Sequence, residues 1–435
     1  MQILPNNDNS CGWIETLPPR SANSTLMGEK HAKWLIIGAG YSGLSAAITL
    51  AENCPNDEII LIDANKAGEG ASSRNSGYLV DSTLNDGHLS DTDFDAYKSK
   101  YELNHKSVFY VKSLIEKYSI DCDWNECGKY YASADLNSEK KLKQFHHLLN
   151  DLNIKSSLIE REKLTQNLGI DFYKTAVKVY GGAMLQPAAL ARGMVNNLPR
   201  NVHLYENTPV LSISKGQPHK VIFQKGFISA ENVIVAVNGF MPSLNIKKNR
   251  VFPLLLTASL TRPLTRQEQQ QMNHTSEWGV LSANPMGATV RYTSDKRIMI
   301  RNTVDVSSSL QLSPSELAKK QKIHLQGLQK RFPFLPTDVF KYCWSGITCI
   351  SSNNANVFEQ TAKNFWTIGC YNGGGIGLAT LFGQQIAYQA MDKLQPITKA
   401  IIARKQASYL PPQPFLNIGV RAKLAIDRLH AKKDN

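Results

Sequence analysis

The sequence predicts an α/β protein whose first domain is built on a parallel sheet, and three stretches carry that prediction. Residues 34–37 form a short apolar run, a glycine-rich turn follows, and residues 44–51 have the composition of a helix. Residues 59–62 form a second apolar run that ends at Asp63, and residues 232–239 form a third that ends in a small-residue turn. Short apolar runs without polar alternation, joined by helices, are typical of parallel strands that are buried on both faces.

The turn after the first run predicts a dinucleotide site. Gly38, Gly40 and Gly43 have the G-x-G-x-x-G spacing. Gly38 permits a tight turn, Gly40 lets the backbone approach a pyrophosphate, and Gly43 lets the helix pack closely on the strand. Asp63 follows about twenty residues later and can accept hydrogen bonds from ribose hydroxyls. These residues indicate a Rossmann-like domain that holds an adenine dinucleotide at a helix N-terminus.

Composition narrows the class of protein. Apolar residues make up 42% of the 435 residues and charged residues 20%, which is typical of a globular chain with a large core. No apolar run approaches the roughly 18 residues of a spanning helix, and the N-terminus lacks the pattern of a secretory signal. The cysteines are odd in number and never spaced C-x-x-C, so we expect a reduced, cytoplasmic protein without a disulfide framework or zinc site. They are Cys11, Cys54, Cys122, Cys127, Cys343, Cys349 and Cys370.

The net charge of +13 raises the question of an anionic partner. Lysines and arginines are scattered and no basic run has interleaved aromatic residues, so nucleic acid is not expected. The C-terminal stretch is different, because five cations alternate there with apolar residues at helical spacing. Two interpretations stay open, a terminal helix packed on its own protein with a solvated basic face, or a peripheral contact with anionic lipid. The cations are Arg421, Lys423, Arg428, Lys432 and Lys433, and the apolar residues are Ile418, Val420, Leu424, Ile426 and Leu429.

Catalytic and metal-binding motifs of other classes are not found. His146 and His147 are adjacent and would point to different faces of a helix, so no metal site is predicted. No Ser, His and Asp residues have spacing that supports a triad.

Four segments together resemble the D-amino-acid-oxidase-like (DAO-type) family of FAD-dependent oxidoreductases, and within it the branch that contains gamma-glutamylputrescine oxidoreductase. The first is the 38–43 turn with Asp63, and the second is 68–77, similar to the family's G-A-S-x-R-N-x-G segment. The third pairs Thr208-Pro209-Val210 with residues 235–239, and the fourth is the glycine-rich turn and helix of residues 369–383. The resemblance implies that non-covalent FAD is the cofactor. It also implies that the helix after the glycine-rich turn in residues 369–383 points its N-terminus at the flavin, where its N–H groups would stabilise the anionic reduced ring.

The residues expected to bind FAD are drawn from these four segments. They are Gly38, Gly40, Ser42, Gly43, Asp63, Ala64, Gly70, Ala71, Ser72, Arg74, Asn75, Ser76, Gly77, Val210, Ala236, Asn238, Gly239, Gly373, Gly374, Gly375, Ile376 and Gly377.

The resemblance also implies the domain organisation. We expect a discontinuous, Rossmann-like FAD-binding domain and a second, α+β substrate domain built on a mixed or antiparallel sheet that covers the flavin. The predicted boundaries are an N-terminal lead-in of residues 1–30, an FAD-binding domain of 31–95, 188–248 and 343–400, a substrate domain of 96–187 and 249–342, and a basic tail of 401–435.

The implied activity is oxidation of the C–N bond of an amine or amino acid, including gamma-glutamylated polyamines, by an oxidase or a dehydrogenase. Hydride transfer to flavin N5 would give an imine that hydrolyses to an aldehyde or keto acid. Two alternatives stay open, a flavin-binding protein of the same fold with a degenerate site, and an NAD-linked dehydrogenase.

The substrate site departs from the family pattern. Many members carry an R-P-x-T-x-D-type segment before the last strand, but residues 344–354 here contain neither arginine nor aspartate. We therefore expect Arg291 and Tyr292, on the flavin-covering sheet, to be the polar pair of the site, and Trp344 to form a wall. Cys349 lies near the position where sarcosine-oxidase relatives attach FAD covalently, but we expect a buried, inert thiol.

Overall fold

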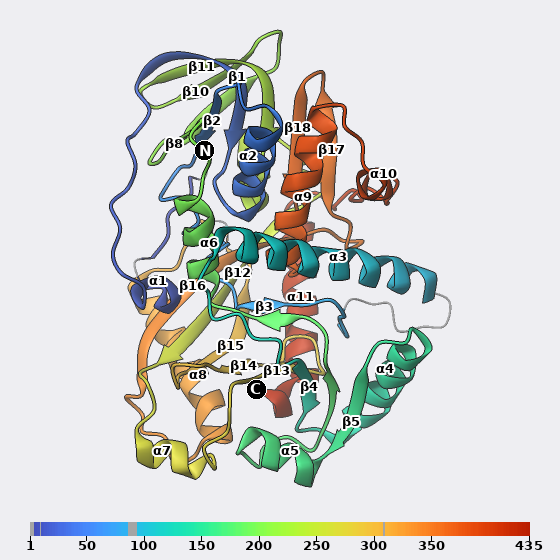
Figure 1. Cartoon of the computed structure of the whole chain (residues 1–435). Helices are drawn as coiled ribbons and strands as arrows, with labels where there is room; N and C mark the ends of the chain where they lie inside the picture. Colours follow the sequence, from blue (N-terminus) through green and yellow to red (C-terminus); the bar gives the residue numbers. More distant parts are fainter. Residues whose placement is uncertain (1–3, 9, 86–93, 308) are drawn as a thin grey trace.

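The structure is a computed structural model that describes residues 4–8, 10–85, 94–307 and 309–435, and two large β-sheets organise it (Figure 1). The first sheet has the order β17-β18-β11-β1-β2-β8, and β10 and β9 extend it from β11. Its strands are β1 (Gly28–Ile37), β2 (Ile59–Ile62), β8 (Val202–Tyr205), β9 (Val210–Ser214), β10 (His219–Phe223), β11 (Gly226–Val235), β17 (Val357–Ala362) and β18 (Phe365–Gly369).

The centre of the first sheet is parallel, because β11, β1, β2 and β8 pair in one direction and β18 joins β11 in the same sense. The last four residues of β1 are buried on both faces, which explains their continuous apolar sequence. Two helices lie side by side on one face, α2 (Tyr41–Asn53) directly after β1 and α9 (Gly375–Ala390) directly after β18 (Figure 1). Both helices therefore begin at the carboxyl edge of this sheet, where ligands of open α/β folds bind.

The second sheet is mixed, with the order β16-β12-β15-β14-β13-β4-β6-β5. Only the β13–β4 pair is parallel among its described pairings. Its strands are β4 (Lys129–Ser133), β5 (Ser156–Glu160), β6 (Thr175–Val179), β12 (Phe252–Thr261), β13 (Trp278–Ser282), β14 (Thr289–Tyr292), β15 (Ile298–Asp305) and β16 (Phe340–Ile350). A parallel first sheet with a mixed second sheet confirms the predicted fold class.

The remaining elements cover the sheets and join them. They are α1 (Gly12–Glu15), α3 (Phe94–Tyr118), α4 (Glu139–Asp151), α5 (Arg161–Leu168), α6 (Pro187–Asn196), α7 (Arg266–Gln271), α8 (Pro314–Arg331), α10 (Pro396–Ile402), α11 (Phe415–His430), the two-stranded sheet of β3 (Tyr78–Leu79) and β7 (Ala183–Met184), and the short 3-10 helices η2 (Leu136–Ser138), η3 (Asn238–Leu244) and η4 (Lys432–Asp434). α8 begins at a capping box between Ser313 and Glu316 and covers the face of the second sheet formed by β12, β15 and β16.

The placement of three segments differs from the predicted boundaries. α3 packs in the same apolar core as α2 and α9, although residues 96–118 are predicted to lie with the substrate domain. β16 pairs with β12 in the second sheet, although residues 343–350 are predicted to lie with the FAD-binding domain. The lead-in is structured as well, since Trp13 of α1 is buried against Trp344. Local apolar pattern cannot tell which of two sheets a strand joins, because both choices bury the same residues.

The C-terminus is fastened to the second sheet. The Asp434 carboxylate is buried and accepts hydrogen bonds from Ser133 Oγ at 2.9 Å, Ala134 N at 2.7 Å, Ser282 Oγ at 2.8 Å and Asn284 Nδ2 at 2.8 Å. The described part of the chain contains no helix with both the length and the hydropathy to span a membrane.

We predict that Asp434→Ala destabilises the fold by about 3 kcal/mol, because it leaves several buried donors without an acceptor. A lower midpoint of thermal unfolding would show this. Asp427→Ala is the matched control, since among the described residues Asp427 pairs with the exposed Lys423 alone and its loss should have a much smaller effect. Equal midpoints for Asp434→Ala and the parent protein would contradict the fastening role.

Candidate active site

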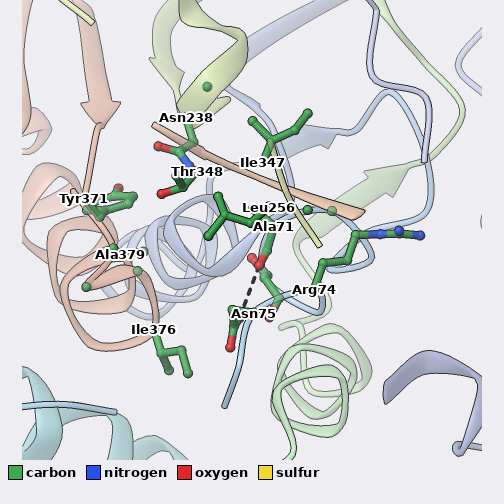
Figure 2. Close-up of a pocket in the computed structure, with 18 of the residues that line it drawn as sticks. Ala71, Arg74, Asn75, Asn238, Leu256, Ile347, Thr348, Tyr371, Ile376 and Ala379 are labelled. Carbon is green, nitrogen blue, oxygen red and sulfur yellow. Dashed lines mark hydrogen bonds between the residues drawn. The ribbon is translucent and has the colours of Figure 1, made fainter. Parts of the chain in front are cut away.

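A cavity of about 670 Å³ lies between the carboxyl edge of the first sheet and one face of the second. The ends of β1, β2 and β11 line it, together with the starts of α2 and α9 and residues of β12, β15 and β16. All the residues predicted from the sequence to bind a cofactor line this cavity except Gly43, Gly77 and Gly377. In Figure 2, Ile376 and Ala379 of α9 approach the cavity from one side, and Ala71 and Asn75 from the other.

The three glycines of the first turn have the geometry that their spacing predicts. Gly38 has a φ of +100°, and a Cβ there would come within 2.7 Å of the Ala236 carbonyl oxygen. A Cβ on Gly40 would meet only Ser72 Oγ, at 2.9 Å, because the residue faces open space. A Cβ on Gly43 would collide with the Gly38 carbonyl, so Gly43 serves the contact between helix and strand and lies behind the cavity.

Asp63 closes the edge of the sheet beside this turn. Its Oδ2 accepts from Ala39 N at 2.7 Å and its Oδ1 from Asn65 N at 2.9 Å, which holds the carboxylate at the cavity wall. Burial raises the pKa of Asp63 to about 6, more than these hydrogen bonds lower it, and the nearby Glu206 raises it further. A carboxylate oxygen has more than one acceptor site, so each can still receive a ribose hydroxyl.

The loop after β2 is held by two ion pairs that no sequence motif indicates, although one of them includes Arg74, which was expected to contact FAD. The Arg74 guanidinium points away from the cavity (Figure 2) and donates to Asp8 Oδ1 at 2.8 Å and to the Ser345 carbonyl at 3.0 Å. Burial opposes ionisation of Asp8, but the Arg74 charge and the Ser345 hydrogen bonds outweigh it and lower the pKa of that carboxyl. Arg74 therefore fixes the loop to the second sheet while its backbone lines the cavity.

A second ion pair fastens the same loop. Buried Glu206 accepts from Arg20 Nη2 at 2.6 Å and also from Ala67 N. Both Arg20 and Asp8 belong to the lead-in, far from the loop in sequence, so no local pattern could have revealed these contacts.

The glycine-rich turn before α9 brings a helix N-terminus to the cavity. Gly373 has a φ of +93°, and no side chain caps the helix. The first N–H groups of a helix have no intrahelical acceptor, so those of α9 are available to a ligand. Ser42 Oγ and the Tyr371 hydroxyl lie 2.6 Å apart and connect the starts of α2 and α9.

The polar pair expected on the second sheet does not lie in the cavity. Arg291 and Tyr292 are adjacent in β14, so their side chains project from opposite faces of the sheet. Tyr292 packs between Trp278 and Ile298 in the core beneath α8. The structure thus corrects the expectation that both face the flavin, since strand alternation allows only one of them to do so.

Arg291 projects from the same face of the sheet as Thr289, which lines the cavity. It lies two residues farther along β14 and does not reach the cavity. It pairs with Glu277 at 2.8 Å and donates to the Leu185 and Gly77 carbonyls, and a Cβ on Gly77 would occupy the space of its guanidinium. Trp344 is also fully buried away from the cavity, with its Nε1 donating to the Arg74 carbonyl at 3.2 Å. Neither residue is among those that line the cavity, so both have structural contacts instead of the expected substrate contacts.

Arg301 of β15 is the arginine of the second sheet that lines the cavity, to which Arg74 and Arg404 contribute from other segments. It lies opposite Thr289 in the register of β14 and β15. The Arg291–Met299 pair lies on the same face, and the Val290–Ile300 pair lies between the two. Its Nη2 donates to Thr289 Oγ1 at 2.8 Å, and no carboxylate of a described residue lies within 4.0 Å. Burial lowers the pKa of Arg301, more than the neighbouring Tyr78 raises it. The sequence places both arginines on the same sheet but does not show which one reaches the cavity.

Cys349 is buried and absent from the cavity lining, although Thr348 and Ile350 on either side belong to it. A hydrogen bond with Cys370 and burial raise the pKa of its thiol well above the usual value. The thiol is therefore neither placed nor ionised for a bond to a ligand in the cavity.

We predict that Gly40→Val abolishes retention of FAD while the protein still folds. The branched side chain would enter open space at the helix N-terminus, where the pyrophosphate is expected, and would displace only Ser72 Oγ. The flavin absorbance of the purified protein measures the outcome. Gly419→Val on α11, where a Cβ meets nothing within 4 Å, is the matched control and should retain FAD. Full flavin content in Gly40→Val would contradict the dinucleotide site.

We also predict that FAD affinity falls as the pH drops through about 6. Above that pH Asp63 is ionised and accepts ribose hydroxyls in charge-assisted hydrogen bonds, whereas its protonated form loses that advantage. Titration of the FAD-free protein with FAD at a series of pH values would measure this. Asp63→Asn should bind more weakly at neutral pH and lose the pH dependence, and an unchanged profile in that variant would assign the effect to another group.

Comparison with known proteins agrees with this geometry. The model of the DAO family, described as FAD dependent oxidoreductase, matches residues 33–389. The chain is 25% identical over 362 residues to gamma-glutamylputrescine oxidoreductase of Escherichia coli strain K12, covering 81% of this chain and 82% of that protein. It is also 25% identical over 374 residues to the probable oxidoreductase OrdL of Haemophilus influenzae, covering 82% of both.

Solved structures show the same fold at lower identity. Glycine oxidase from Geobacillus kaustophilus superposes with a TM-score of 0.72 at 17% identity, over 84% of this chain and 96% of that one. Because the family model covers most of the chain, the protein belongs to the DAO family of FAD-dependent oxidoreductases.

Proposed function

We propose that this protein oxidises the C–N bond of an amine that also carries a carboxylate, such as an amino acid or a gamma-glutamylated polyamine. The observation that carries the proposal is the contrast between two arginines on one face of the second sheet. Arg291 is neutralised by Glu277, whereas Arg301 lines the cavity without a carboxylate partner among the described residues. A half-buried guanidinium without a counter-ion is stabilised when a ligand supplies the negative charge.

The residues of the cavity fit FAD. Gly40 and Gly375 face open space that a Cβ would begin to fill, and the uncapped α9 supplies free N–H groups. Asp63 stands at the carboxyl edge of the sheet, where the ribose is expected. The starts of α2 and α9 and the 68–76 loop would hold the cofactor, and bound FAD would supply a hydride acceptor. The match to an FAD-dependent family removes the support for the NAD-linked alternative.

The protein's own residues would bind and orient the substrate. Arg301 can present two parallel N–H donors to a carboxylate, and its bond to Thr289 Oγ1 fixes the plane of the guanidinium. Tyr131 and Leu281, from neighbouring strands, line the same cavity. Tyr131 is held in place because its hydroxyl donates to the Ser82 carbonyl at 2.7 Å. A carboxylate bound at one end leaves the amine carbon as the part of the substrate free to approach the cofactor.

The names of relatives agree with a substrate of this class. Gamma-glutamylputrescine and glycine, the compounds in two of those names, each contain an amine and a carboxylate. Both compounds therefore carry a negatively charged carboxylate, the group that Arg301 would bind in the proposed substrate.

We predict that Arg301→Gln raises the concentration of a carboxylate-bearing amine needed for half-maximal flavin reduction by about 10- to 100-fold. The expected loss is one bidentate, charge-assisted contact of about 1.5–3 kcal/mol. Anaerobic bleaching of the flavin by glycine, other amino acids, gamma-glutamylputrescine and putrescine would measure it. Putrescine lacks a carboxylate, so its reaction should not change in the variant. Arg301→Lys, which keeps the charge but loses the planar fork, should fall between the two proteins.

Two outcomes would contradict the proposal. If Arg301→Gln weakens reduction by putrescine and by the amino acids equally, Arg301 does not bind the carboxylate. If no amine in the panel bleaches the flavin of the parent protein, the site is degenerate. Arg161→Gln, which removes an exposed arginine on α5, is the control for unspecific loss of positive charge.

A further inference from the structure

An apolar stripe lies on the outer surface of the C-terminal helix α11. Phe415, Ile418, Ile426 and Leu429 are 67%, 62%, 53% and 72% exposed, and no residue of this helix is buried. These four side chains recur at intervals that place them on one side of a helix of 3.6 residues per turn, with the exposed Ala422 between them. Leu416, Val420 and Leu424 occupy the opposite side and are half-buried against the protein. The helix thus has two apolar sides, of which one packs against the protein and the other is exposed.

The outer stripe is held in place and does not belong to a loose tail. Before the helix, Leu410 N donates to the Asn249 carbonyl at 2.8 Å and Arg250 Nη1 donates to the Ala407 carbonyl at 2.6 Å. After the helix, the Asp434 carboxylate is buried in the second sheet with four hydrogen-bond donors around it. Anchors at both ends keep α11 along the body of the protein (Figure 1), so its outer side faces away from the core.

Cations border the stripe on both sides. Arg421 and Arg428 follow one edge and Lys423 follows the other, and all three are exposed. Arg421 also donates to the Val306 carbonyl, and Arg428 donates to the Val304 carbonyl and lies 3.6 Å from an Asp305 oxygen. The single acid of the helix, Asp427, lies toward the protein, where its side chain is 14% exposed and pairs with Lys423. An apolar stripe with basic edges and no acid on its outer side is complementary to a bilayer surface that carries negative charge.

The same charges argue against a second copy as the partner. Two α11 stripes packed against each other would bring the basic edges of both helices together, with no exposed acid on either helix to neutralise them. Sixteen residues are also too few to span a bilayer, for which about 20 are needed, so the helix would lie parallel to the surface.

We propose that α11 is a docking surface for an anionic lipid bilayer. The apolar stripe would enter the boundary between headgroups and acyl chains. Arg421, Lys423 and Arg428 would exchange their surface contacts with Val306, Asp427 and Asp305 for contacts with the headgroups. The contact is independent of the oxidation reaction, because none of these residues lines the cavity.

Co-sedimentation of the FAD-loaded protein with vesicles tests the proposal. We expect binding to vesicles of phosphatidylglycerol and phosphatidylcholine, little binding to phosphatidylcholine alone, and weaker binding as salt rises. Ile418→Ser together with Leu429→Ser should reduce partitioning at least about tenfold. Arg421→Gln together with Lys423→Gln should reduce it about twentyfold.

Matched controls come from other surfaces of the same protein. Phe109→Ser on α3 removes a side chain that is 60% exposed, and Lys163→Gln on α5 removes an exposed cation, and neither should change partitioning. Flavin content and circular dichroism report whether each variant is folded. If the apolar pair does not fold, the charge pair alone decides the test.

Three results would overturn the proposal. The first is an absence of binding to the anionic vesicles, and the second is partitioning that none of the α11 variants reduces. The third is a stable dimer in analytical ultracentrifugation that Ile418→Ser dissociates, since this would make the stripe an interface between copies of the chain.

Discussion

The close contact between the start of α2 and the middle of α9 is the constraint on which the site depends. The two helices are more than three hundred residues apart in sequence, yet a Cβ on Gly383 of α9 would collide with the Ser42 carbonyl of α2. Gly43 makes the corresponding contact with the strand behind it. Small residues at these points allow both helix N-termini to reach one cavity, where their N–H groups and dipoles add together. Larger side chains would separate the helices and direct the two dipoles to different places.

The second sheet shows how position along a strand decides the role of a residue. Arg291 and Arg301 have the same chemistry and lie on the same face, but one pair of the ladder separates them. The Arg291 guanidinium pairs with Glu277 and donates to two backbone carbonyls, whereas the Arg301 guanidinium faces the cavity. A single step of about 7 Å along the strands therefore separates a structural ion pair from a candidate substrate contact.

The cofactor half of the site could be predicted from the sequence because its determinants are local. The spacing of Gly38, Gly40 and Gly43, the position of Asp63 and the turn before α9 each act within a few residues of a strand end. The substrate half could not, because it depends on how two sheets are placed relative to each other. Residues 344–354 contain no arginine, so the sequence directs the search for a substrate arginine to the second sheet, but choosing Arg301 over Arg291 requires the register of β14 and β15. The adjacent pair Arg291 and Tyr292 was inconsistent with strand alternation, a test that the sequence alone permits.

One carboxylate near each chain end, the half-buried Asp8 and the buried Asp434, connects that end to the walls of the cavity. Asp8 joins the N-terminal segment to Arg74 and to Ser345 of β16, beside the loop that lines the cofactor end of the cavity. Asp434 joins the C-terminus to Ser282 and Asn284, which line the cavity close to Thr289 and Arg301. Turns lack the ladder partners of a strand, so their N–H and hydroxyl groups need other acceptors, and one carboxylate can serve several of them. The chain ends thus stabilise segments at both ends of the cavity. α11 lies between the contact of Leu410 with Asn249 and the buried Asp434.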